Sequence, residues 1–117
     1  MTIKKFNLRW DDFRYNFHET LKDIKVDESL CDISLVTEDE QILKAHKLVL
    51  SATSQYFQSI FKKTHDHHPN MFVFMPGIDF ENLNHLLTYM YEGEVQVRLA
   101  TKIFQGFGEV LFREFRL

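Results

Sequence analysis

The sequence has little cysteine, glycine and proline. Its 117 residues include a single cysteine, Cys31, together with four glycines and two prolines. One cysteine cannot close a disulfide within the chain and leaves no cysteine pair for a structural zinc site, which favours a reducing intracellular compartment. With 44% hydrophobic residues and 12 phenylalanines, the chain has enough apolar material to fold, and we expect residues 1–117 to form one globular domain.

The sequence also lacks an excess of positive charge and any long apolar run. Its net charge of −3 offers no basic surface for phosphate groups, so we expect no direct contact between this domain and nucleic acid. No stretch approaches the roughly 20 apolar residues that span a bilayer, and the charged start of the chain is not followed by an apolar segment. We therefore expect neither a membrane anchor nor a signal peptide.

The common catalytic motifs are missing as well. The sequence contains no glycine-rich phosphate loop, no Gly-x-Ser-x-Gly turn and no zincin helix. Cys31 begins an apolar segment and is interpreted as a packing residue, while His46 is expected to bond backbone groups at a helix start. His65, His67 and His68 are interpreted as part of a solvated loop rather than a metal site. We expect no enzymatic activity, no cofactor and no bound metal.

The first segment alternates between apolar and polar residues. Phe6, Leu8 and Trp10 fall on one face, which predicts a short strand over residues 6–10. No neighbouring segment is an obvious partner for this strand. The three side chains could alternatively fold back on their own domain, and the sequence alone does not separate these alternatives.

A helical period follows the predicted strand. Apolar residues recur at helical spacing at Phe13, Phe17, Leu21 and Ile24. This spacing predicts an amphipathic helix that ends near Lys25. Asp11 or Asp12 can cap the free N–H groups of its first turn.

A β-hairpin is predicted next. Residues 31–37 alternate and lead through the acidic turn 38–40 into a second strand over residues 41–45. One face of the first strand carries Cys31, Ile33 and Leu35.

Two helical pieces come after the hairpin, over residues 47–52 and 55–62. Ser54 is a suitable N-cap for the second piece. The buried stripe of that helix is predicted to be Phe57, Ile60 and Phe61.

The second half of the chain continues to mix strands and helices. Residues 71–75 are continuously apolar and stopped by Pro-Gly, which predicts a buried strand. Asp79 can cap a helix that stops at Gly93, a residue suited to a left-handed C-cap. A short strand is predicted over residues 94–97. A last helix is predicted from the apolar residues Ile103, Phe107, Val110 and Leu111.

The whole order of elements indicates an α+β domain with helices covering a small sheet. Four motifs also carry a family resemblance: Phe-Asn-Leu-Arg-Trp-Asp-Asp-Phe at 6–13, Leu-Cys-Asp-Ile-Ser-Leu at 30–35, Lys-Ala-His-Lys-Leu-Val-Leu-Ser-Ala-Thr-Ser-Gln-Tyr-Phe at 44–57 and Leu-Thr-Tyr-Met-Tyr-Glu-Gly-Glu-Val at 87–95. Together they resemble the tramtrack-type branch of the BTB/POZ domain family.

The resemblance implies a BTB/POZ fold, in which a small three-stranded sheet is flanked by helices and the N-terminal strand is exchanged with a partner chain. It implies a homodimer or higher homo-oligomer, with hetero-oligomers of related BTB domains as a further option. A strand that leaves its backbone groups unpaired is an association site on physical grounds too. The expected dimer interface consists of Phe6, Leu8, Trp10, Phe13 and Phe17.

Asp32 and Lys47 match positions where the resemblance implies an acidic and a basic residue near the central groove of the dimer. A carboxylate beside a cation lowers the cost of burying both groups, and this charged groove would serve structure or partner binding. The alternative is an ordinary exposed pair worth at most about 1 kcal/mol.

For function, the resemblance implies a homodimerisation and protein-interaction domain of a nuclear transcription regulator, which recruits transcriptional co-regulators. The chain would be the N-terminal fragment of a longer protein. The alternative is a substrate adaptor of a cullin-3 type ubiquitin ligase. Relatives that bind cullin often carry a hydrophobic-x-Glu motif, whereas Phe61 is followed here by two lysines, with Lys63 at the position of the glutamate. A third possibility is self-association alone.

Overall fold

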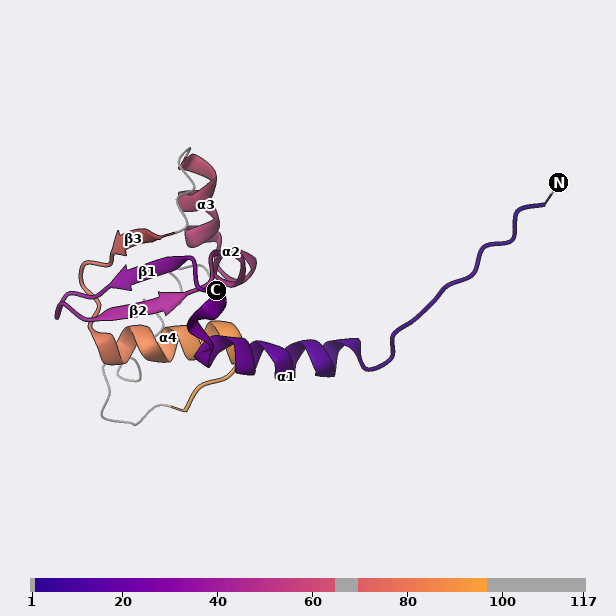
Figure 1. Cartoon of the computed structure of the whole chain (residues 1–117), viewed down its shortest axis with the longest axis horizontal. Helices are drawn as coiled ribbons and strands as arrows, with labels where there is room; N and C mark the ends of the chain where they lie inside the picture. The colour runs from indigo at the N-terminus through magenta and orange to yellow at the C-terminus, as the bar shows by residue number, and fades with distance from the viewer. Residues whose placement is uncertain (1, 65–69, 97–117) are drawn as a thin grey trace.

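The computed structural model describes residues 2–64 and 70–96. In chain order the elements are α1 (Phe13–Val26), η1 (Glu28–Leu30), β1 (Ile33–Val36), β2 (Ile42–Ala45), α2 (Lys47–Thr53), α3 (Gln55–Lys63), β3 (Met71–Phe74) and α4 (Phe80–Glu92). This is the predicted α+β architecture (Figure 1). The predicted last helix and the three clustered histidines lie outside the described residues.

The three strands form one mixed sheet with the order β2-β1-β3. β1 pairs antiparallel with β2, which confirms the predicted hairpin, and parallel with β3. β2 returns the chain to the end of the sheet where β1 begins, and α2 and α3 then carry it past β1 to the other edge, where β3 starts. The register aligns Leu35 with Leu43 on one side and Val73 on the other, so one apolar face runs across all three strands.

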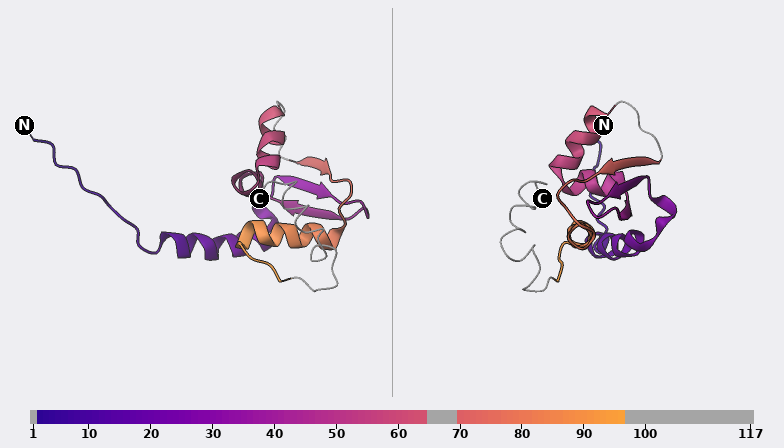
Figure 2. Two further views of the ribbon diagram at one scale, coloured as in Figure 1. Left: turned by 180° about the vertical axis from the view of Figure 1, so that it is seen from behind. Right: turned by 90° about the vertical axis from the view of Figure 1, so that its left-hand side faces the viewer.

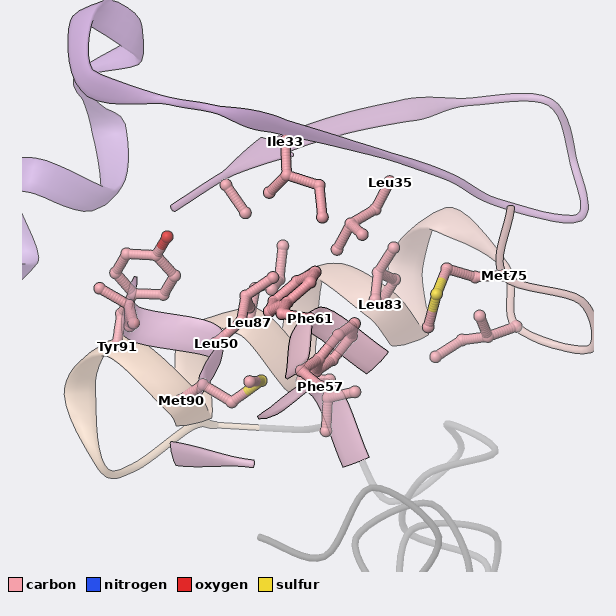
Figure 3. Close-up of a cluster of buried hydrophobic side chains, with 14 residues drawn as sticks. Ile33, Leu35, Leu50, Phe57, Phe61, Met75, Leu83, Leu87, Met90 and Tyr91 are labelled. Carbon is pink, nitrogen blue, oxygen red and sulfur yellow. The ribbon is translucent and has the colours of Figure 1, made fainter. Parts of the chain in front are cut away.

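The hydrophobic core lies between this inner face of the sheet and the helices. Ile33 and Leu35 point from β1 toward α4 and the crossover helices, as Figure 3 shows. Leu83 and Leu86 of α4 and Phe57 of α3 are fully buried. Because a small sheet cannot bury its apolar face alone, α4 and α3 are what make the strands stable.

Two of the three predicted helix caps are present. The Ser54 hydroxyl accepts a hydrogen bond from the Phe57 N–H at 3.3 Å, and the Asp79 carboxylate accepts one from the Asn82 N–H at 2.9 Å. Gly93 ends α4 in the left-handed conformation, with φ at 79°, as predicted. The predicted cap of α1 is wrong, because Asp12 has ψ near 13° rather than the extended backbone of a capping residue and makes no side-chain cap bond.

The interpretation of residues 71–75 as a buried strand is only half right. β3 is an edge strand, and its side chains alternate between the core and the surface. Met71 and Val73 pack on the core, but Phe72 is 63% exposed and Phe74 is 60% exposed. The sequence pattern predicted burial on both faces because both faces of the strand are apolar. Only one of them is covered in the chain as described.

Two further predicted strands are absent from the described residues. Residues 6–10 are extended but unpaired and run outward from the domain beyond α1 (Figures 1 and 2). Residues 94–96 have no strand assignment, and Val97 lies outside the described part of the chain. Both corrections have one physical reason: a strand needs hydrogen-bonding partners, and these segments have none within the described chain.

A buried polar link joins α4 to the junction between β2 and α2. The Tyr91 hydroxyl oxygen accepts a hydrogen bond from the His46 backbone N–H at 2.9 Å and lies 2.7 Å from the Nδ1 atom of the same residue. The hydroxyl thus contacts both the backbone and the ring of His46. Burial raises the pKa of the Tyr91 phenol, so it remains a donor at neutral pH. His46 therefore bonds a tyrosine hydroxyl through its ring, not the backbone groups that we predicted.

We expect Tyr91→Phe to lower the free energy of unfolding by about 1–3 kcal/mol, because it leaves the His46 N–H and Nδ1 buried without their partner. Tyr15→Phe is the matched control, since Tyr15 is 68% exposed and should change stability little. Urea unfolding of both variants at one protein concentration measures the difference. Equal stability of the two variants would show that this link does not hold α4 in place.

Candidate interaction surface

An exposed aromatic strip runs from the N-terminal arm along α1. Trp10 contacts Phe13 edge-on with ring centroids 5.2 Å apart, and Phe13 contacts Phe17 at 5.7 Å. Phe6 and Leu8 continue the strip outward and are 84% and 94% exposed. The five residues of the predicted interface therefore lie along one continuous segment. The alternative in which the arm folds back on its own domain is not what the structure adopts.

Helix α1 is anchored to the domain from His18 onward. Leu21 packs against the core, and the His18 ring donates a hydrogen bond from Nε2 to the carbonyl oxygen of Glu92 at the end of α4, at 2.8 Å. The N-terminal end of α1 projects beyond the domain together with the arm, as Figures 1 and 2 show from opposite sides. Phe13 lies on this projecting end, and Phe17 lies where the helix reaches the domain.

An apolar groove begins where the aromatic strip ends. It has a volume of about 380 Å³ and lies between α1, η1 and α2. Its lining residues are Phe17, Leu21, Ile24, Leu30, Asp32, His46, Leu48, Val49, Ala52 and Thr53. Leu30 and Leu48 are 66% and 80% exposed, so the mouth of the groove is as apolar as its walls. Phe17 belongs to both features, which makes the strip and the groove one surface.

Of the predicted charged pair, Asp32 lines this groove and is bonded to the backbone of Lys47. The Asp32 carboxylate accepts a hydrogen bond from the Lys47 backbone N–H at 2.8 Å. Asp32, which directly precedes β1, thus caps the first turn of α2, while His46, at the N-cap position, makes no side-chain cap bond. The contact that joins the two residues in the structure is this cap.

Cys31 and His46 meet next to the groove without forming a reactive pair. The Cys31 Sγ lies 3.6 Å from the His46 Nε2. Burial raises the pKa of the Cys31 thiol, and the charges of Glu28, Asp32 and Asp27 raise it further. The raised pKa keeps the Cys31 side chain in its thiol form, which is a poor nucleophile. This agrees with the interpretation of Cys31 as a packing residue.

The described residues contain neither a metal-binding cluster nor a membrane-spanning helix. Within residues 2–64 and 70–96, no group of three or more His, Cys, Asp or Glu side chains is placed to hold a metal ion. Over the same part of the chain, every helix is too short or too polar to cross a membrane.

The sequence identified the aromatic strip and Asp32 but missed the groove itself. Leu48 and Leu30 were not singled out, because isolated leucines in a helix or a loop are usually core residues. One signal could have identified Leu48: α2 buries Val49 and Leu50, so an apolar residue directly before them must point elsewhere.

Comparison with known proteins identifies the family. The sequence profile of the BTB/POZ domain family matches residues 21–106. In Drosophila melanogaster, the Longitudinals lacking protein-like is 34% identical over 94 residues, which cover 80% of this chain and 72% of that protein. The sex determination protein fruitless is 36% identical over 94 residues, and the alpha isoform of the protein tramtrack is 35% identical over 97 residues.

The match covers 80% of this chain for fruitless and 83% for tramtrack, but only 10% and 12% of the lengths of those two proteins. Among solved structures, the BTB domain of zebrafish PATZ1 superimposes with a TM-score of 0.72 at 24% sequence identity, covering 96% of this chain and 89% of that one. Its similarity supports the fold. The chain is a member of the BTB/POZ domain family.

Proposed function

We propose that this domain is the homodimerisation and protein-interaction module of a nuclear transcription regulator of the tramtrack type. BTB/POZ domains generally mediate protein interactions and oligomerisation. The observation that carries the proposal is the continuous exposed apolar surface formed by the arm, the projecting end of α1 and the groove. A contiguous apolar surface of this kind marks an interaction site.

The occupant that we propose for this surface is a second copy of the chain. The arm presents an extended apolar row with unpaired backbone groups, and such a segment gains most by adding to another sheet. The projecting end of α1 and the groove next to it are complementary in character, since one is an apolar ridge and the other an apolar hollow. In two copies related by a twofold axis, each arm can add to the sheet of the other copy while each ridge packs into the groove of the other copy.

The transcriptional role rests on the resemblance of the four motifs and on the similarity to fruitless and tramtrack. In this proposal the domain joins copies of the regulator and recruits co-regulators or related BTB domains, while nucleic acid is bound elsewhere in the protein. Linking several binding modules in this way raises avidity. A role as substrate adaptor of a cullin-3 type ligase is the weaker candidate. Lys63, the last residue of α3, occupies the position where the cullin-binding motif has glutamate.

We expect the wild-type chain to have the mass of two chains or more in light scattering at micromolar concentration. Phe6→Ala, Leu8→Ala and Trp10→Ala in one variant should weaken assembly by more than about 100-fold, since burying each large apolar side chain stabilises by about 1.5–3 kcal/mol. The matched control substitutes the alternate residues, Asn7→Ala with Arg9→Ala. A monomeric wild type, or equal losses in the two variants, would contradict the proposal.

Substitutions of Asp32 separate its structural role from a role in partner binding. We expect Asp32→Ala to lower the free energy of unfolding by about 1 kcal/mol, because α2 loses its cap, and Asp32→Asn to recover most of this loss by keeping an acceptor oxygen. Urea unfolding measures both. If the charge itself serves the groove, Asp32→Asn with Lys47→Gln will still impair recruitment of a co-regulator in a binding assay. Unchanged recruitment by that folded double variant would show that Asp32 serves only to cap α2.

A further inference from the structure

The strand β3 lies at an edge of the sheet, and within residues 2–64 and 70–96 no strand pairs with its outer side. The Met75 N–H donates a hydrogen bond to the Val36 carbonyl oxygen at 2.8 Å, on the side of β1. Backbone groups alternate in direction along a strand, so those of Val73 point toward β1 as well. The N–H and C=O groups of Phe72 and Phe74 therefore point to the open edge.

The same two residues carry the exposed rings of this edge. Phe72 is 63% exposed and Phe74 is 60% exposed, on the outer face of the sheet, opposite the core. Native proteins commonly protect the edge strands of a sheet with charged residues, above all lysine. The other edge strand, β2, contains Lys44, whereas Met71–Phe74 contains no charged residue. β3 is thus the edge that can accept another strand.

The exposed area indicates what kind of partner fits. The exposed parts of Phe72, Phe74 and Ile42 on the outer face amount to roughly 350 Å², taking about 200 Å² for each large side chain. Two folded domains in contact through such faces would bury at most about 700 Å², which is below the roughly 1,200 Å² of a stable interface. A single extended segment also gains backbone hydrogen bonds along the edge, so it does not depend on the area of the face alone.

We propose that the open edge of β3 binds an extended segment of a partner protein, which adds as a further strand and has apolar side chains at alternate positions. The alternation follows from the pleat, since every second side chain of an added strand lies on the outer face, beside Phe72 and Phe74. The inference rests on the proposed role in protein interaction, for which it names a surface and the chemistry of a recruited segment. It does not require the dimer.

A synthetic peptide of about seven residues, in which phenylalanine or valine alternates with threonine or lysine, is the probe of the edge. We expect it to bind the chain with a dissociation constant in the micromolar range, measured by fluorescence polarisation. Every second amide of an added strand points to β3, so methylating one alternate set of amides should abolish binding and methylating the other should change it little. Equal effects of the two methylations, or no binding at millimolar concentration, would overturn the inference.

Substitutions on the two edge strands locate the bound peptide. Phe72→Thr/Phe74→Thr should weaken binding by at least about tenfold, since threonine keeps the β propensity of the strand but removes the rings. Ile42→Thr is the matched control, because Ile42 is 53% exposed on the same face but β1 and β3 separate it from the added strand. It should bind the peptide like the wild type. Equal losses in the two folded variants would place the peptide across the face instead of along the edge, and would refute the inference.

The variant Phe6→Ala/Leu8→Ala/Trp10→Ala separates this inference from the proposed dimer. It leaves β3 intact, so we expect it to lose assembly and to bind the peptide like the wild type. Tighter binding by this variant would show that the arm of a second copy occupies the edge, which would contradict the inference. A Phe72→Thr/Phe74→Thr variant that loses mass in light scattering with unchanged peptide binding would assign the face to contact between copies, with the same consequence. A monomeric wild type that binds the peptide along β3 would contradict the dimer alone and support the inference.

Discussion

The structure depends on covering one face of a very small sheet. Three strands of four residues each cannot form a stable sheet in water by themselves, and their inner face is buried against α4, α2 and α3. Leu35, Leu83 and Phe57 are fully buried at this contact. The Tyr91 hydroxyl, bonded to His46, fixes α4 against the junction of β2 and α2. This single layer of packing is the hydrophobic core of the described domain.

A core of this size does not use all the apolar side chains of the sequence. Large aromatic and aliphatic residues remain on the arm, on the first half of α1, at the mouth of the groove and on the outer face of the sheet. Their positions are not scattered, since each group forms a continuous row or hollow. The polar residues near them have structural tasks: Asp32 caps α2, and Cys31 and His46 are held in the bonded cluster with Tyr91. These polar groups therefore support the fold.

The sequence predicted the local elements well where a local cause decides them. Ser54, Asp79 and Gly93 were assigned correctly, because capping depends on a few neighbouring backbone groups. Asp12 was assigned wrongly, because the backbone entering α1 turns and its carboxylate does not reach the free N–H groups. The groove could not be predicted, since it is formed where α1 and α2, more than twenty residues apart in the sequence, lie side by side.

By itself the sequence determined the α+β order of elements, the hairpin, the two caps and the resemblance to the BTB/POZ family, all of which follow from residue type and short-range spacing. Only the tertiary structure decided which apolar residues are covered. Phe72 and Val73 are neighbours of similar character, yet Val73 packs on the core and Phe72 faces outward. The physical reason is that burial depends on which element packs against each face of a strand. When both faces of a strand are apolar, its sequence does not indicate which face will be covered.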